Sequence, residues 1–184
     1  QTAYTQVAFE MSPVRIGVVP ADHAFEPHSP SAWRMSNTHE SWAWNGCEGK
    51  ETRVEIYARG AKVALFLNGK PMGEKALDRD SRAAFRVAWQ PGELTAVVYG
   101  QDGAELGRAS LRSAGEETVL AAEPERDTVR PGGLCYVRLR YTDETGLLKP
   151  LARGDIKVEV EGGTVLGLGS ACPYNGRGYL TATT

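Results

Sequence analysis

The middle of the chain alternates apolar and polar residues with a period of two, which is typical of strands that bury one face. The apolar positions of this pattern are Val54, Ile56, Ala58, Val63, Leu65 and Leu67. The positions between them in the first strand are Arg53, Glu55 and Tyr57. Asn68-Gly69 then supplies the positive φ angles of a tight turn, so we expect a hairpin that returns through residues 70–75.

The same rhythm of strands and turns continues through the rest of the chain. Further strands are predicted at residues 83–89, 94–99, 105–111, 118–122, 134–141 and 156–160. Turn sequences rich in glycine, proline and aspartate separate them, among them Pro91-Gly92, Asp102-Gly103 and Pro131-Gly132. Short strands at this spacing predict antiparallel β-sandwiches rather than alternating strands and helices.

The N-terminal residues follow a different pattern. Residues 1–10 have helix-like apolar spacing, and residues 14–19 read as a short strand. A charged break at residues 113–117 separates two groups of later strands. We therefore divide the chain into an N-terminal segment, 1–19, a first sandwich, 20–114, and a second sandwich, 115–184.

Two tryptophans one residue apart precede the first alternating strand. The run is Ser41-Trp42-Ala43-Trp44-Asn45-Gly46-Cys47-Glu48-Gly49-Lys50. Together with the hairpin that follows, up to Pro71-Met72-Gly73, it resembles the segment after the catalytic barrel in glycoside hydrolase family 2, which includes many bacterial β-galactosidases. Gln90-Pro91-Gly92-Glu93-Leu94 and the glycine-rich stretch at residues 167–174 are similar to later parts of the same enzymes.

The resemblance implies an all-β chain of two consecutive immunoglobulin-like antiparallel β-sandwich domains. The second would be incomplete, because the family's closing strand follows a loop in which this chain stops. Residues 1–19 would be the remnant of the preceding barrel. The implied role is that of a non-catalytic accessory part of a β-galactosidase-type enzyme of carbohydrate metabolism. It would pack on its own upstream barrel, shape the cleft or form homo-oligomer contacts.

Catalysis by the chain itself is not expected. Glycoside hydrolysis needs two carboxyl groups that flank the scissile bond. The acidic pairs Glu116-Glu117 and Asp143-Glu144 fall in predicted turns, where solvated acids are the rule. In the family the catalytic glutamates lie on the barrel, so no catalytic residue is carried over.

Trp33, Trp42 and Trp44 are the candidate substrate-binding residues. Exposed indoles can stack on sugar rings, and a galactoside-containing carbohydrate is then the ligand to expect. An indole in a loop also packs readily in a core or at a domain interface, where its N–H needs one partner. Packing is the preferred interpretation.

The rival function is that of a free-standing carbohydrate-binding or adhesin-type immunoglobulin-like module, in which these rings would form an exposed row. Trp89 ends a predicted strand and is expected in the core.

Charge and hydropathy disfavour two classes of partner. The formal net charge of −2 leaves no basic excess to neutralise a nucleic-acid backbone. No apolar run approaches the ~20 residues that cross a bilayer. We expect neither nucleic acid nor membrane as a partner.

Histidines and cysteines offer no recognisable metal site. The three histidines are His23, His28 and His39, and the three cysteines are Cys47, Cys135 and Cys172. Their spacings match no ligand pattern, so neither a metal nor a cofactor is predicted. Unpaired thiols favour a reducing, cytoplasmic compartment over a periplasmic or secreted one. Cys135 shares a strand side with Val137 and Leu139 and is expected to be a small buried apolar group.

Overall fold

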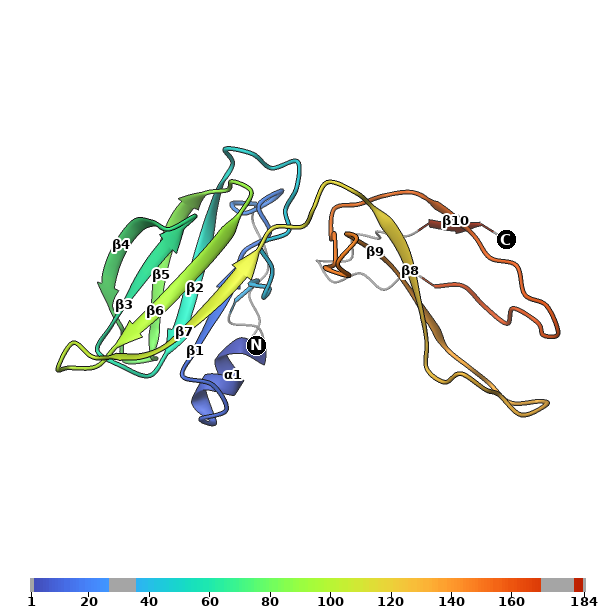
Figure 1. The fold of residues 1–184 in the computed structure, drawn as a ribbon, viewed down its shortest axis with the longest axis horizontal. Coiled ribbons are helices and arrows are strands. Elements are labelled where there is room, and N and C mark those ends of the chain that lie inside the picture. The colour runs from blue at the N-terminus through green and yellow to red at the C-terminus, as the bar shows by residue number, and fades with distance from the viewer. Residues whose placement is uncertain (1, 27–35, 170–180, 184) are drawn as a thin grey trace. The chain divides into compact units, whose positions relative to one another are not determined.

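The computed structural model describes residues 2–26, 36–169 and 181–183. It divides the chain into two compact units, Gln1–Ser113 and Ala114–Thr184. Apart from one short helix, the regular elements of these described residues are β-strands, so the predicted all-β class is confirmed (Figure 1). In the described part of the chain, no helix is long and apolar enough to span a membrane.

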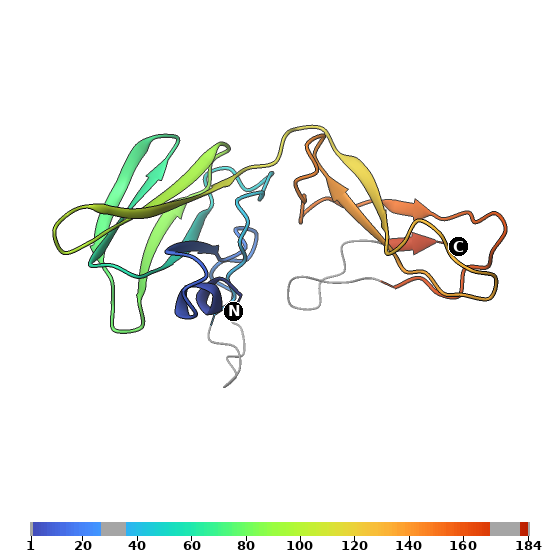
Figure 2. The ribbon, with the colours of Figure 1, turned by 60° about the horizontal axis from the view of Figure 1, so that its bottom comes forward.

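The first unit is a sandwich of two antiparallel sheets (Figures 1 and 2). Its elements are α1 (Thr2–Ala8), β1 (Val14–Val18), β2 (Glu51–Ala58), β3 (Lys62–Leu67), β4 (Lys70–Ala76), β5 (Arg82–Ala88), β6 (Glu93–Tyr99) and β7 (Glu105–Arg112). One sheet has the order β1-β2-β5 and the other the order β4-β3-β6-β7. This arrangement of three and four strands is that of an immunoglobulin-like sandwich.

The core of this unit follows the period-two pattern. The inward residues of β2 are the predicted Val54, Ile56 and Ala58, each with 0% of its surface exposed. From the opposite sheet, Leu65 and Leu94 are also 0% exposed. Because successive strand residues point to opposite faces, one register of pairing buries all of these side chains together.

The predicted hairpin at Asn68-Gly69 is confirmed. Asn68 has φ 51° and Gly69 has φ 75°, the two positive angles that a two-residue turn requires. The turn joins β3 to β4, and β4 is the edge strand of its sheet with all of its residues exposed. The β3–β4 pairing shifts register between Leu65 and Phe66, opposite a Gly73 with φ 123°.

At the N-terminus the structure differs from the sequence-based division. The segment 1–19, interpreted as a barrel remnant, lies within the first unit, because β1 pairs with β2 from Val14↔Ala58 to Val18↔Val54. The apolar residues of β1 complete the inner face of the three-stranded sheet. The pairing with β2 fixes which side of β1 faces inward, and the opposite sheet, through β6 and β7, covers that side.

The second unit contains β8 (Val119–Pro124), β9 (Val137–Thr142), β10 (Asp155–Lys157) and β11 (Thr181–Thr183). β8 and β9 form an antiparallel ribbon, and β10 pairs in parallel with β11. The predicted strand at 134–141 begins three residues late, and Cys135 lies before it. Its side chain is only partly buried, so the expected core position was wrong. On the same side of the strand, Val137 is 53% exposed, whereas Leu139 is partly buried.

Candidate functional site

The tryptophan loop and the strand end at Trp89 form one closed cluster. Trp42, Trp44 and Trp89 are each 0% exposed. The Trp42 indole N–H donates to the carbonyl of Gln90 at 2.9 Å, and the Trp89 indole N–H donates to the carbonyl of Trp42 at 2.9 Å. The two ring systems lie 6.1 Å apart at an angle of 39°. Each indole therefore fixes the backbone that carries the other one, and the core position expected for Trp89 is confirmed.

The rest of the loop folds back through its own backbone. The Trp44 indole N–H donates to the carbonyl of Ser41 at 3.0 Å, and the Cys47 N–H donates to the carbonyl of Trp44 at 3.0 Å. Gly46, with φ 91°, allows the sharp turn between these contacts. Cys47 is 2% exposed, and burial raises the pKa of its thiol, which favours the neutral form.

A second cluster lies on the outer face of the three-stranded sheet. Glu55 is 3% exposed, and its Oε2 atom accepts hydrogen bonds from the Tyr57 hydroxyl at 2.6 Å and from the Ser36 hydroxyl at 3.0 Å. Its Oε1 atom lies 2.9 Å from Nη2 of Arg53. Burial and the adjacent Glu55 carboxylate raise the pKa of Tyr57 to about 12. The cluster ties the segment that begins at Ser36 to the sheet.

Sequence reasoning missed this cluster, because Glu55 and Tyr57 occupy the outward positions of an alternating strand. The cover comes from residues remote in sequence, α1 and the segment around Thr38, whose hydroxyl lies 3.3 Å from that of Tyr57. A tyrosine and a glutamate two residues apart on one strand face gave the available signal, since a phenol and a carboxylate at this spacing can share a hydrogen bond.

The second unit carries a buried carboxylate that was expected to be solvated. Asp143 is 1% exposed, and its Oδ1 atom accepts hydrogen bonds from the N–H groups of Thr145 and Leu147, each at 2.9 Å. Its Oδ2 atom accepts from the N–H of Gly115 at 2.9 Å. These bonds, led by one from the Thr145 hydroxyl, hold the pKa of Asp143 far below its usual range. The turn was predicted correctly, but Asp143 is buried in it and accepts hydrogen bonds from backbone N–H groups.

Lys149 completes this arrangement. Its ammonium group donates to the carbonyls of Gly115, Glu116 and Glu117 at 3.0, 2.7 and 3.0 Å. Together with Asp143 it holds residues 115–117 against the turn that follows β9. Both side chains satisfy backbone groups, which is a structural role.

The described residues bring together no arrangement suited to hydrolysis or metal binding. Glu55 has a phenol and a hydroxyl as its near neighbours at Oε2, not a second carboxylate. An open depression at the tip of the β8–β9 ribbon has no acidic residue in its lining of Arg126, Thr128, Val129, Arg130 and Gly133. No group of three or more potential ligands that could hold a metal ion occurs within the described ranges.

The candidate substrate-binding residues separate into two groups. Trp42 and Trp44 lie in the closed cluster, where neither ring presents a face to solvent. The third candidate, Trp33, lies outside the described residues. The same is true of His28 and Cys172. A sugar contact by any of the three tryptophans stays a prediction.

The first unit is an immunoglobulin-like β-sandwich whose tryptophan cluster is closed to solvent. Comparison with known proteins identifies its relatives. A family described as a domain of unknown function, DUF4982, matches residues 49–107. The chain is 31% identical over 137 residues to Beta-galactosidase BoGH2A of Bacteroides ovatus, a match that covers 72% of this chain and 16% of that protein.

Solved structures give the same result. A glycosyl hydrolase family 2 member from Bacteroides cellulosilyticus is 28% identical, with a TM-score of 0.60, over 82% of this chain and 20% of its own. A second structure of a family 2 member from this species gives a TM-score of 0.62 at the same identity and coverage. The resemblance to the C-terminal β-sandwich domains of glycoside hydrolase family 2 is therefore confirmed. The chain spans about a fifth or less of the length of these relatives.

Proposed function

We propose that the chain is a non-catalytic accessory segment of a glycoside hydrolase family 2 enzyme of the β-galactosidase type. It packs on the catalytic barrel of that enzyme and shapes one rim of its cleft. The observation that carries the proposal is the unequal coverage of the match to Beta-galactosidase BoGH2A, 72% of this chain but 16% of that protein. Further chain in the same enzyme would supply the barrel and close the second sandwich.

Burial of the tryptophan loop supports a packing role within this function. A free-standing carbohydrate-binding module, the rival function, needs exposed rings, and Trp42 and Trp44 are 0% exposed. Their indole N–H groups are already bonded to backbone carbonyls. We propose that both residues hold the shape of the loop, which leaves Trp33 as the candidate for sugar contact.

The function is tested by assaying the 184-residue chain and the longer polypeptide that contains it with aryl β-galactosides and aryl β-glucuronides. We expect the blank rate for the chain and hydrolysis of the galactoside by the longer polypeptide. Saturable hydrolysis by the chain, lost in Glu55→Gln but kept in the exposed control Glu74→Gln, would overturn the proposal. Titration with galactose-containing oligosaccharides separates the rival, because an affinity of the chain that is lost in Trp33→Ala favours a binding module.

A further inference from the structure

The helix α1 presents an uncharged, partly apolar outer side. Its sequence, TAYTQVA, contains no charged residue. Ala3 and Val7 are buried, 6% and 2% exposed, in a cluster with Tyr57. On the outer side and just after the helix, Tyr4, Phe9 and Met11 are 43%, 75% and 73% exposed. A helix at a protein surface normally turns charged or polar residues to water. On α1 the exposed residues are Tyr4, Thr5 and Ala8, and none of them is charged.

This helix is held firmly in place. A helix of seven residues is too short to be stable by itself, so its contacts must hold it. The Arg59 side chain donates to the carbonyls of Val7 at 3.1 Å and Ala8 at 2.9 Å, and it also pairs with Glu10. Glu10 has φ 61°, and the Met11 N–H donates to the Gln6 carbonyl at 2.8 Å, which ends the helix in a left-handed cap. The exposed apolar groups thus belong to a fixed element.

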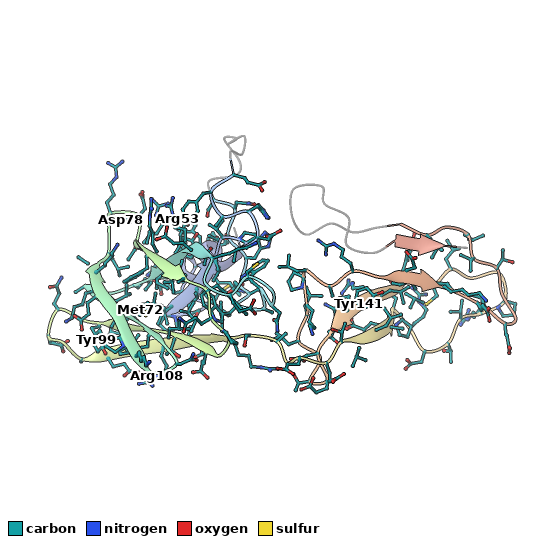
Figure 3. The ribbon with its side chains drawn as sticks, turned by 90° about the horizontal axis from the view of Figure 1, so that it is seen from above. Arg53, Met72, Asp78, Tyr99, Arg108 and Tyr141 are labelled. Atoms are coloured by element: carbon teal, nitrogen blue, oxygen red, sulfur yellow. The ribbon has the colours of Figure 1, made fainter. Side chains whose placement is uncertain are left out.

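The opposite side of the sandwich has a different surface chemistry. On the outer face of the four-stranded sheet, Lys62 lies 2.6 Å from Glu74, and Arg108 lies 2.7 Å from Glu105. Figure 3 labels Met72, Tyr99 and Arg108, which belong to β4, β6 and β7 of this sheet. Charged pairs of this kind are typical of a solvated face. The two sides of the first unit are therefore unequal, and the α1 side is the one suited to a partner.

We propose that Tyr4, Phe9 and Met11 form a docking surface, the α1 surface, for the catalytic domain of the same polypeptide. The inference rests on the proposed function and names the face through which the first unit meets its partner. The α1 surface has no charge to satisfy except the Glu10–Arg59 pair at its edge. It therefore fits an apolar patch on the partner rather than a charged one.

The area of this surface favours a partner joined by the chain over a free one. Three side chains at these exposures offer roughly 400 Å² at the usual areas of aromatic residues. Each partner in a stable complex of separate proteins buries about 800 Å². A covalently attached domain needs less area, because its effective concentration is high. The relatives also have most of their length outside the matched region, since the chain covers 16% of BoGH2A.

The test compares two double variants in the 184-residue chain and in the longer polypeptide. One is Phe9→Lys with Met11→Lys. The matched control is Met72→Lys with Leu106→Lys, which changes residues 40% and 50% exposed on β4 and β7. In the 184-residue chain we expect both pairs to leave the unfolding midpoint unchanged, because all four side chains are exposed there.

Hydrogen exchange of the α1 amides gives the decisive measurement. We expect at least about tenfold slower exchange in the longer polypeptide than in the 184-residue chain, and loss of that difference with the Phe9 and Met11 pair but not with the control pair. Equal exchange in both proteins, or equal effects of the two pairs, would overturn the α1 surface. Dimerisation of the 184-residue chain that the Phe9 and Met11 pair abolishes would also overturn it, because the occupant would then be a second copy.

The same samples distinguish this inference from the proposed function. A longer polypeptide without glycosidase activity contradicts the function, whereas exchange at α1 still reports whether the helix is covered. A fully active longer polypeptide whose α1 amides exchange as in the 184-residue chain removes the docking surface and leaves the function standing.

Discussion

In the first unit Trp42, Trp44 and Trp89 are each 0% exposed, whereas in the second unit Leu120 and Val137 remain 44% and 53% exposed. Both regions show the alternation that marks a core-facing side. Leu120, Ala122, Pro124, Val137, Leu139 and Tyr141 share one face of the β8–β9 ribbon by their pairing. The opposite face carries the Glu123–Arg140 ion pair. Alternation thus identifies the side of a strand to be covered, but a second sheet must supply the cover.

The two units are consequently stabilised by different interactions. The first has a core of large apolar side chains, while Ile156 is the large apolar side chain that is buried among the described residues of the second. In the second unit, Asp143 and Lys149 bind backbone groups at the base of the ribbon. A ribbon of two strands is marginal without a packed face. The expectation that this sandwich is incomplete stays a prediction.

The largest effect is expected for Trp89→Ala in the first unit. Truncation of a buried tryptophan destabilises a protein by about 3–5 kcal/mol, and here it also leaves the carbonyl of Trp42 without its donor. Tryptophan emission measures the first unit alone, because residues 114–184 contain no tryptophan. Urea unfolding followed by emission should show a large fall in the midpoint. An unchanged midpoint would mean that the cluster does not stabilise the sandwich.

Acid should act on the second unit through Asp143. The pKa of this carboxyl is lowered in the folded state, so its stabilising contribution is complete above the unfolded pKa of about 3.9 and is lost as the pH falls below it. We expect Asp143→Asn to destabilise the second unit at neutral pH and the difference from the parent to shrink between about pH 5 and pH 2. Hydrogen exchange of the β8 and β9 amides measures this difference in stability. A difference that is constant with pH would contradict the carboxylate's role.

A smaller effect is expected for Gly69→Val in the first unit. A β-branched residue at φ 75° is strained, although nothing lies within 4 Å of the added Cβ position. The free energy of unfolding, measured by urea unfolding, should therefore fall by ~1 kcal/mol or more. Gly167→Val is the matched control, because that glycine has open space and no positive φ. Similar effects of the two substitutions would show that the turn conformation is not the cause.

The smallest effect is expected for Glu105→Gln. Its partner Arg108 is exposed, and pairs of exposed charges contribute little because water screens them. Thermal unfolding should show no measurable change. A clear loss of stability would mean that the four-stranded sheet is covered on its outer face, and it would weaken the contrast between the two sides of the first unit.

Local pattern was sufficient where neighbours in sequence are neighbours in space. The β3–β4 hairpin follows from alternation and from Asn68-Gly69, and the core position of Trp89 follows from its strand. The burial of Glu55 did not follow, because its cover comes from Ser36, 19 positions away, and from Tyr57 beneath α1. Asp143 was misjudged for a related reason, since Gly115 reaches it from 28 positions away. Alternation also gave no warning that Cys135 would be only partly buried by the described residues.

The edge strand β4 has a consequence for handling the protein. Every residue from Lys70 to Ala76 is exposed. The strand contains two lysines, a proline and the register shift at Gly73. Such an edge resists the addition of a foreign strand, because proline lacks a donor and a bulge bends the hydrogen-bonding row. At high concentration the first unit should therefore not seed fibrils along this edge.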